Sequence, residues 1–164
     1  MNESSKFSSS KYREDLLSAI SAGFFFILVG AIFVTTPNLF DATIAFFRDF
    51  DNVRVPHTKN LLLPAPVSPS AHSDLYSAVT KFSLIWGLYQ IAILALRFIA
   101  HSPLSKKAET ASNIVFWLGA SYLINTFLIE TTTWFAFWAT IIMLVGVSLI
   151  GRAVILAAMR PKLS

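Results

Sequence analysis

Residues 16–36 form a continuous apolar stretch without a charged side chain. An α-helix rises about 1.5 Å per residue, so a helix of this length matches a bilayer hydrocarbon core of about 30 Å. Such a helix is stable in lipid because it satisfies its backbone hydrogen bonds internally. A signal peptide is the alternative, but the apolar run is longer than usual and no Ala-x-Ala-like cleavage site follows it. The stretch therefore predicts a retained transmembrane helix.

Three further apolar stretches predict additional spans, which gives spans at residues 16–36, 78–100, 111–129 and 134–156. Only 13% of the 164 residues are charged, which is low for a soluble domain. The short connections between the last three spans make these helices neighbours. We expect an all-α membrane protein, with a four-helix transmembrane domain at 16–157 arranged as an up-down bundle. Residues 1–15 and 158–164 are expected as cytoplasmic tails, the first of them mostly mobile.

The basic residues predict the orientation, because Lys and Arg accumulate on the cytoplasmic side of membrane proteins. With a cytoplasmic N-terminus, the inner side holds Lys6, Lys11, Arg13, Arg97, Lys106, Lys107, Arg152, Arg160 and Lys162, and the outer side holds Arg48, Arg54, Lys59 and Lys81. We therefore expect a multi-pass protein of the cell membrane with both termini in the cytoplasm.

The first outer connection, residues 37–77, is long and begins with an amphipathic pattern. In "NLFDATIAFFRDFDN" the apolar residues form two adjacent helical rows, which are Phe40, Ile44 and Phe47, and Leu39, Phe46 and Phe50. We predict a helix of about three turns with Asn38 as its cap. Two placements stay open: the helix lies on the outer membrane surface, or its apolar face packs onto the end of the bundle.

The second part of this connection, "VRVPHTKNLLLPAPVSPSAH", is rich in proline. Proline favours extended or polyproline backbone, so we expect a loop without helix, and the segment would make a poor central strand. The three consecutive leucines Leu61, Leu62 and Leu63 are too apolar for a free linker. We predict a packed lid that these leucines anchor.

Polar residues occur at helical spacing within the second and third spans, and they form the candidate intramembrane cluster of Ser83, Gln90, Ser121, Tyr122 and Asn125. Small and amide side chains commonly join transmembrane helices, each bond contributing about 1 kcal/mol, so packing is the favoured interpretation. A polar path for a channel or transporter through Gln90, Tyr122 and Asn125 is the alternative. Arg97 and Arg152 lie near the cytoplasmic ends of their spans. There we expect headgroup binding or ion pairs, with Glu14, Asp15 or Glu109 as partners.

Several classes of function are disfavoured. The chain has no cysteine, and its three histidines, His57, His72 and His101, fall in predicted loops, which argues against haem between the spans. His57 and His72 with Asp74 match no recognised metal motif. No hydrolase, kinase or P-loop pattern occurs, and the net charge of +4 comes from scattered basic residues, which suit lipid headgroups better than nucleic acid. We expect no enzyme activity, no cofactor and no metal.

The segments "LIWGLYQIAILALRF", "SPLSKKAE", "NIVFWLGASYLINTFLIETTTWFAFW" and "LPAPVSPSAH" together resemble a group of small archaeal four-span membrane proteins with no assigned function. The resemblance covers most of residues 36–157. It implies the four-span fold, and it implies no substrate, cofactor or mechanism.

The favoured hypothesis is a non-enzymatic membrane protein that acts through assembly. It would form a homo-oligomer or serve as an accessory subunit of an unidentified membrane partner, with the outer loop as its recognition surface. A small channel or transporter is the alternative. A lipid-modifying enzyme is weaker still, because no cluster of acid, base and nucleophile is visible.

Overall fold

The computed structural model describes residues 3–158 and is almost entirely helical in this range. Its elements are α1 (Glu3–Thr35), α2 (Leu39–Arg48), β1 (Phe50–Arg54), β2 (Leu62–Pro66), the short 3₁₀ helix η1 (Pro69–His72), α3 (Ser73–Ile99), α4 (Leu104–Ile124), the π-helical turn η2 (Asn125–Glu130) and α5 (Trp134–Ala158). Four of the helices are long and apolar enough to cross a membrane, which confirms that part of the sequence prediction.

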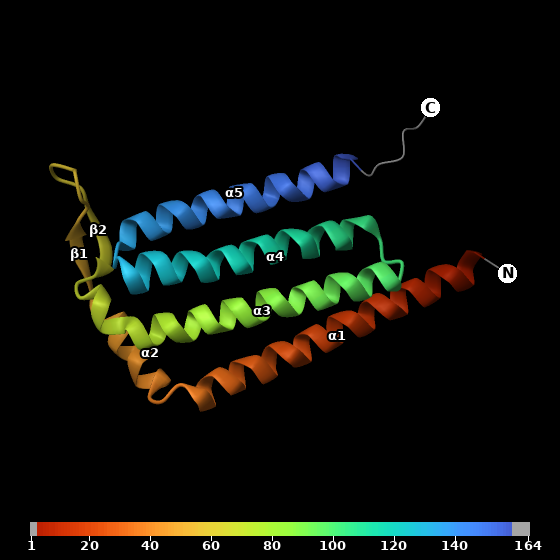
Figure 1. The fold of residues 1–164 in the computed structure, drawn as a ribbon, viewed down its shortest axis with the longest axis horizontal. Helices are drawn as coiled ribbons and strands as arrows, with labels where there is room; N and C mark the ends of the chain where they lie inside the picture. The colour runs from red at the N-terminus through yellow and green to blue at the C-terminus, as the bar shows by residue number, and fades with distance from the viewer. Residues whose placement is uncertain (1–2, 159–164) are drawn as a thin grey trace.

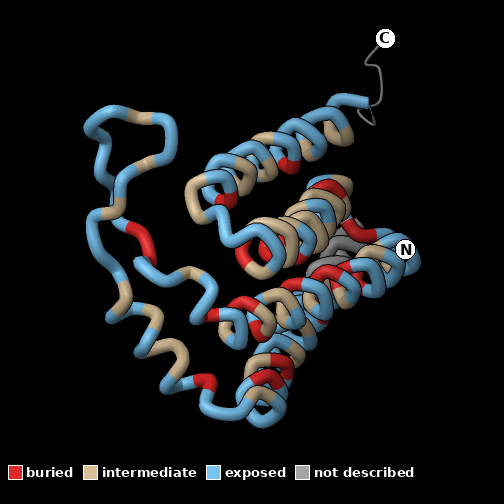
Figure 2. Tube along the Cα trace, turned by 60° about the vertical axis from the view of Figure 1, so that its left-hand side comes forward, coloured by how far each residue is buried: buried red, intermediate tan, exposed pale blue. Residues whose placement is uncertain are grey.

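The four long helices lie in a single row in the order α1, α3, α4, α5, and neighbours run in opposite directions (Figure 1). The main helix contacts are α3 with α4, then α4 with α5, and more sparsely α1 with α3. Buried residues are accordingly concentrated on the two central helices, and few occur on α5 (Figure 2). The row has two open flanks, one formed by α1 and the other by α5.

Glycines allow the central helices to approach closely. A Cβ atom added at Gly87 of α3 would lie 2.6 Å from Leu118 Cδ2 and 3.2 Å from the backbone nitrogen of the same leucine. On the other side of α4, a Cβ atom at Gly119 would lie 2.7 Å from Leu144 Cδ1 of α5. Small residues at these two points therefore set the spacing of α3, α4 and α5.

Aromatic rings make much of the contact between α1 and α3. Phe24 of α1 stacks on Tyr89 with ring centroids 3.9 Å apart and on Trp86 at 6.1 Å. The Tyr89 hydroxyl also reaches Ser21 Oγ, 3.3 Å away. This contact is local, and most other residues of α1 between Tyr12 and Thr35 are exposed.

The helices extend beyond the uncharged stretches that predicted them. α4 begins at Leu104 and includes Lys106, Lys107 and Glu109, because charged side chains are compatible with a helix that has reached the bilayer surface. Similarly, α1 begins at Glu3, inside the segment expected as a tail. The predicted C-terminal tail lies outside the described residues except for Ala158.

Helix α2 divides its two apolar rows between different environments. Leu39 is buried against Leu28, Ile32 and Ala78, so one row packs onto the ends of α1 and α3. The other row is largely uncovered, since Phe40 and Phe47 are 67% and 70% exposed and only Ile44 is half-buried. Asn38 stands at the N-cap with left-handed backbone (φ 55°), but its side chain makes no capping hydrogen bond, unlike the predicted cap.

Strands β1 and β2 form an antiparallel hairpin where the sequence predicted an extended, proline-rich loop (Figure 1). The bonds from Val55 N–H to Leu61 O and from Val67 N–H to Asp49 O place the two strand prolines, Pro64 and Pro66, at non-hydrogen-bonded positions. Their nitrogens face away from β1, where a missing N–H breaks no ladder bond. The sequence argument disfavoured only central strands, and both strands of a two-stranded hairpin are edge strands.

The predicted leucine anchor is also wrong. Leu61, Leu62 and Leu63 are 48%, 55% and 40% exposed, whereas Ala65 and Pro66 on the same strand are buried. The hairpin is therefore attached at its base, beside the helices, and its leucines project freely. Below, "hairpin end" means the end of the row where α1 ends and α5 begins, and "Arg97 end" means the opposite end.

Candidate functional site

An Asp–His pair fastens the base of the hairpin. Asp49, between α2 and β1, accepts a hydrogen bond of 2.9 Å from His72 Nε2 and another of 2.8 Å from the backbone N–H of Ser68. Because the ionised carboxylate carries no hydrogen, the shared hydrogen belongs to the imidazole. These two bonds connect the start of the hairpin to the segment that leads into α3.

The Asp49–His72 pair lies in a buried aromatic environment, which stabilises its hydrogen bond. The His72 side chain is only 7% exposed, and its ring lies edge-on to Phe46 with centroids 5.2 Å apart. Phe46 also contacts Tyr76 and Trp134, so α2, α3 and α5 meet at one aromatic cluster. The hydrogen bond from His72 is the main cause that holds the pKa of Asp49 below its ordinary value of 3.8, and the Ser68 bond acts in the same direction.

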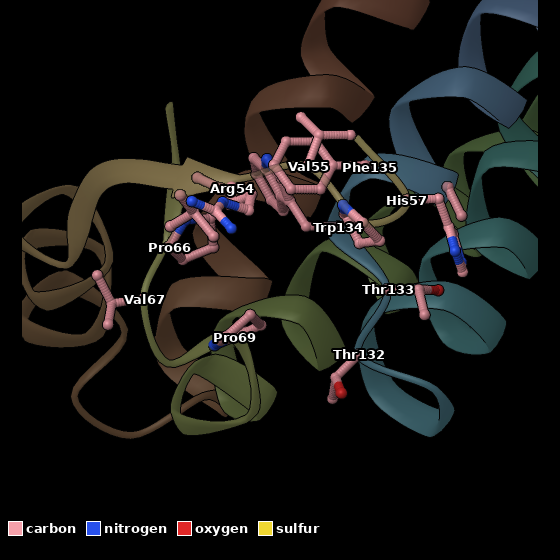
Figure 3. Close-up of a pocket in the computed structure, with 14 residues that line it drawn as sticks. Arg54, Val55, His57, Pro66, Val67, Pro69, Thr132, Thr133, Trp134 and Phe135 are labelled. Atoms are coloured by element: carbon pink, nitrogen blue, oxygen red, sulfur yellow. The ribbon is translucent and has the colours of Figure 1, made fainter. Parts of the chain in front are cut away.

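A cleft of about 670 Å³ separates the hairpin from the start of α5 (Figure 3). Its hairpin wall includes Val53, Arg54, Val55, Pro56, His57, Ala65 and Pro66, and its opposite wall runs from Thr132 to Ala136. This volume is in the range that small-molecule sites and peptide side chains occupy. The cleft exists because Asp49 and His72 hold the hairpin over the connection between η2 and α5.

The lining of the cleft favours recognition over chemistry. Apolar and aromatic groups predominate, and the charged or titratable members are Arg54 and His57. Catalysis of acyl or proton transfer would need a carboxylate, a nucleophile or a second base close to His57, and the lining holds no carboxylate. In the described range 3–158, no group of three or more His, Cys, Asp or Glu side chains could hold a metal ion.

The predicted intramembrane residues do not form one cluster. Ser83, Gln90 and Ser121 are buried, and Ser121 Oγ donates to the backbone oxygen of Thr80, a helix-to-helix bond. Tyr122 is 69% exposed, because it follows Ser121 directly and so points about 100° away around the helix. Asn125 Nδ2 donates to Glu130 Oε1 within η2. Within the described residues, no hydrogen bond joins any two members of the predicted polar path Gln90, Tyr122 and Asn125.

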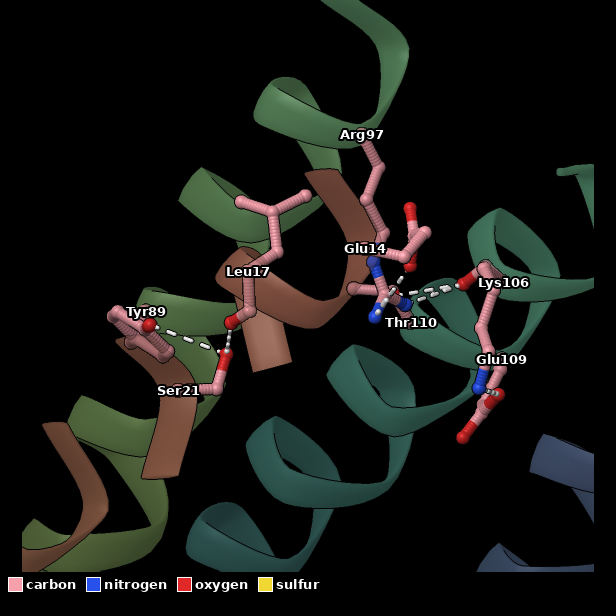
Figure 4. Close-up of polar contacts among 8 residues, drawn as sticks. All are labelled: Glu14, Leu17, Ser21, Tyr89, Arg97, Lys106, Glu109 and Thr110. Atoms are coloured by element: carbon pink, nitrogen blue, oxygen red, sulfur yellow. Dashed lines mark hydrogen bonds and ion pairs between the residues drawn. The ribbon is translucent and has the colours of Figure 1, made fainter. Parts of the chain in front are cut away.

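Arg97 connects three helices at the Arg97 end (Figure 4). Its guanidinium donates to the Lys106 backbone oxygen at 2.8 Å and to Thr110 Oγ1, and its Nη2 lies 3.6 Å from Glu14 Oε2. Glu14 is one of the partners that the sequence suggested. Arg152, the other predicted headgroup or ion-pair residue, is half-buried on α5.

Sequence reasoning missed the Asp49–His72 pair. The two residues are 23 positions apart, and each belongs to a segment that was interpreted separately, one as the end of a helix and the other as part of a loop. The available signal was weak: an aspartate at the end of an amphipathic helix and a histidine just before a span. Only the antiparallel return of the chain brings them together.

Comparison of the chain with protein-family models, with curated proteins and with solved structures finds no match in any of the three. The resemblance to small archaeal membrane proteins therefore stays a prediction, and the functional argument rests on geometry alone.

Acidification is expected to release the hairpin. Because the pKa of Asp49 is lower in the folded protein than its ordinary 3.8, the stabilising bond is fully present above that pH and is lost as the pH falls through the folded value. A spin label on Thr58→Cys should become more mobile below pH 3.8 in the wild-type background. With Asp49→Asn, the label should be mobile at every pH. If the label in the Asp49→Asn variant still becomes mobile only on acidification, as in the wild-type background, another titratable group controls the hairpin.

Proposed function

We propose that this chain is a non-enzymatic, four-span protein of the cell membrane that acts through assembly, as a homo-oligomer or as an accessory subunit. Both termini lie in the cytoplasm, the helices form an up-down arrangement, and the segment from α2 to η1 is the recognition surface on the outer side. The observation that carries this proposal is the open row of helices, because a single layer leaves both flanks without protein neighbours.

The glycines on the flanking helices support assembly through these flanks. Added Cβ atoms at Gly23 and Gly30 of α1, and at Gly146 and Gly151 of α5, would meet nothing within 4 Å. Gly87 and Gly119, in contrast, are used in the central contacts. Gly23 and Gly30 are seven residues apart and so share one face of α1, which gives a second helix a flat surface for close approach.

The cleft at the hairpin end supports the role of the outer segment. A lining of proline, valine and aromatic side chains with one arginine resembles the composition of protein recognition surfaces more than that of a catalytic site. The row of helices would position this surface above the membrane, and the Asp49–His72 pair would keep it in one conformation.

The number of subunits in lipid tests this proposal. In nanodiscs formed directly from membranes, wild-type particles are expected to contain more than one copy or a copurifying membrane protein. Gly23→Leu with Gly30→Leu should reduce this association about tenfold or more, since a close helix contact of a few kcal/mol is blocked. Thermal unfolding of the subunit should not change, because both positions have open space in the structure.

A matched control uses the same change elsewhere on the helix, where Ala31→Leu replaces another exposed small residue of α1. Wild-type particles that hold one copy and no partner would contradict the proposal. Unchanged association in the double glycine variant would contradict the use of the α1 flank.

A further inference from the structure

The far end of the hairpin combines exposed apolar and basic side chains. We use "hairpin tip" for residues 54–63, which comprise the end of β1, the turn and the start of β2. Leu61, Leu62 and Leu63 are all at least 40% exposed. Three consecutive leucines in water are unfavourable, since burying one such side chain fully contributes about 1.5–3 kcal/mol.

The hairpin is poorly suited to pairing with another strand. The outward positions of β2 include Pro64 and Pro66, which have no N–H to donate. On β1, the outward N–H of Asn52 is already bonded to Asp51 Oδ1 at 2.7 Å. Strand addition by a partner or a second copy is therefore hindered at Pro64 and Pro66 of β2 and at Asn52 of β1, and the leucines need a different kind of cover.

The charge of the hairpin tip indicates which kind of surface covers its leucines. Arg54 and Lys59 are cationic, His57 lies between them, and the sequence has no acidic residue between Asp51 and Asp74. Arg54 is directly opposite Leu62 in the strand register, so a cation and an apolar side chain share one face. A surface with anionic groups above an apolar layer complements this arrangement, and an anionic phospholipid bilayer has that structure.

The position of the tip brings it to such a surface. The hairpin extends sideways across the end of the row and reaches past the beginning of α5 (Figure 1). Residues 55–57 line the cleft beside Trp134 and Phe135, the first residues of α5. Tryptophan is enriched at the headgroup level of transmembrane helices, and Trp138 one turn further along α5 is 48% exposed. The tip therefore overhangs the bilayer next to the α5 flank.

We propose that the hairpin tip is a lipid-binding element: its leucines enter the headgroup–acyl boundary beside α5, and Arg54 and Lys59 contact the phosphates of anionic phospholipids. This inference rests on the membrane-spanning part of the proposed function and does not depend on assembly.

The absence of cysteine makes a direct test simple. The full-length chain with Leu62→Cys carries a polarity-sensitive fluorophore in liposomes that contain phosphatidylglycerol and phospholipids brominated near the headgroup. We expect emission shifted to shorter wavelength and strong quenching by the brominated lipid. Ser70→Cys, an exposed site on η1 outside the tip, should show neither effect.

Neutralising Arg54 and Lys59 separates the electrostatic contribution to lipid binding from the hydrophobic contribution of the leucines. Arg54→Gln with Lys59→Gln should reduce the ratio of docked to free tip by roughly 30-fold, because each basic residue contributes about 1 kcal/mol near an anionic surface. Liposomes of phosphatidylcholine alone should weaken docking of the wild-type tip in the same direction. An equal degree of quenching in both lipids and in the double variant would overturn the charge argument.

Two results would overturn the proposal outright. A water-exposed Leu62 label shows that lipid does not cover the tip, and a shifted but unquenched label shows that protein covers it. A label on Leu88→Cys of α3, 52% exposed in the structure and away from the α1 flank, reports on the spans themselves through lipids brominated deep in the acyl chain. Quenching there without quenching at residue 62 rejects the lipid-binding tip alone, whereas its absence at residue 88 rejects the membrane-spanning arrangement of the proposed function.

Discussion

Replacing Arg97 by leucine is expected to lower the free energy of unfolding by about 3 kcal/mol, because removing one partner of a buried ion pair leaves the other charge uncompensated. The Arg97 and Glu14 side chains are only 12% and 14% exposed. Both carboxylate oxygens of Glu14 are buried, and no hydrogen bond reaches them from the described residues. The substitution also removes the bonds from Arg97 to Lys106 and Thr110 on α4. Reversible unfolding in mixed lipid–detergent micelles measures the effect.

The double variant Glu14→Gln with Arg97→Leu provides the control. It lacks the unpaired carboxylate, so it should recover at least about 1 kcal/mol relative to Arg97→Leu alone. Glu14→Gln by itself should cost less, since Arg97 retains its two partners on α4. Equal stability of the double variant and of Arg97→Leu would show that Glu14 and Arg97 do not interact energetically.

Gly87→Ala is expected to destabilise the protein by about 1–3 kcal/mol, the usual cost of overpacking. The added Cβ atom would collide with the Leu118 side chain and would also lie 3.2 Å from the Leu118 backbone nitrogen, which cannot move without shifting α4. Gly119→Ala should cost less, because the atoms nearest to its added Cβ are all side-chain atoms of Leu144, which can adopt another rotamer. The same unfolding assay compares the two variants.

Gly30→Ala is the matched control for these two changes. The position faces open space on α1, and alanine is the better helix former, so the variant should be as stable as the wild type or slightly more stable. A loss at Gly30 as large as the loss at Gly87 would contradict the packing of α3 against α4 described above.

The four long helices could be predicted from the sequence, because the length of an apolar stretch without charged residues can be read directly from neighbouring positions. The ends of these helices were harder to predict. Lys106, Lys107 and Glu109 precede the apolar run but belong to α4, since helical hydrogen bonding does not stop at the membrane boundary. The open row could not be predicted, because which flank of a helix finds a neighbour depends on long-range packing. Tyr122 illustrates this. It is a polar residue next to the buried Ser121, but its side chain faces outward.

The site at the hairpin end was predictable only in part. The amphipathic pattern of α2 could be recognised in the sequence. The hairpin could not, because Pro64 and Pro66 are compatible with strands only in the register that the folded hairpin adopts. The sequence predicted that Leu61, Leu62 and Leu63 anchor a packed lid, whereas the structure leaves each of them at least 40% exposed. The Asp49–His72 pair and the cleft depend on that same return of the chain.

The proposed function includes an orientation in the membrane, with the hairpin end on the outer side and the Arg97 end on the cytoplasmic side. Single cysteines at Ser68, near the base of the hairpin, and at Ser105, at the Arg97 end, are both exposed in the structure. In intact cells, an impermeant maleimide should label Ser68→Cys directly and should label Ser105→Cys only after the membrane is permeabilised. Labelling of both from the same side, or of Ser68→Cys only after permeabilisation, would contradict the account.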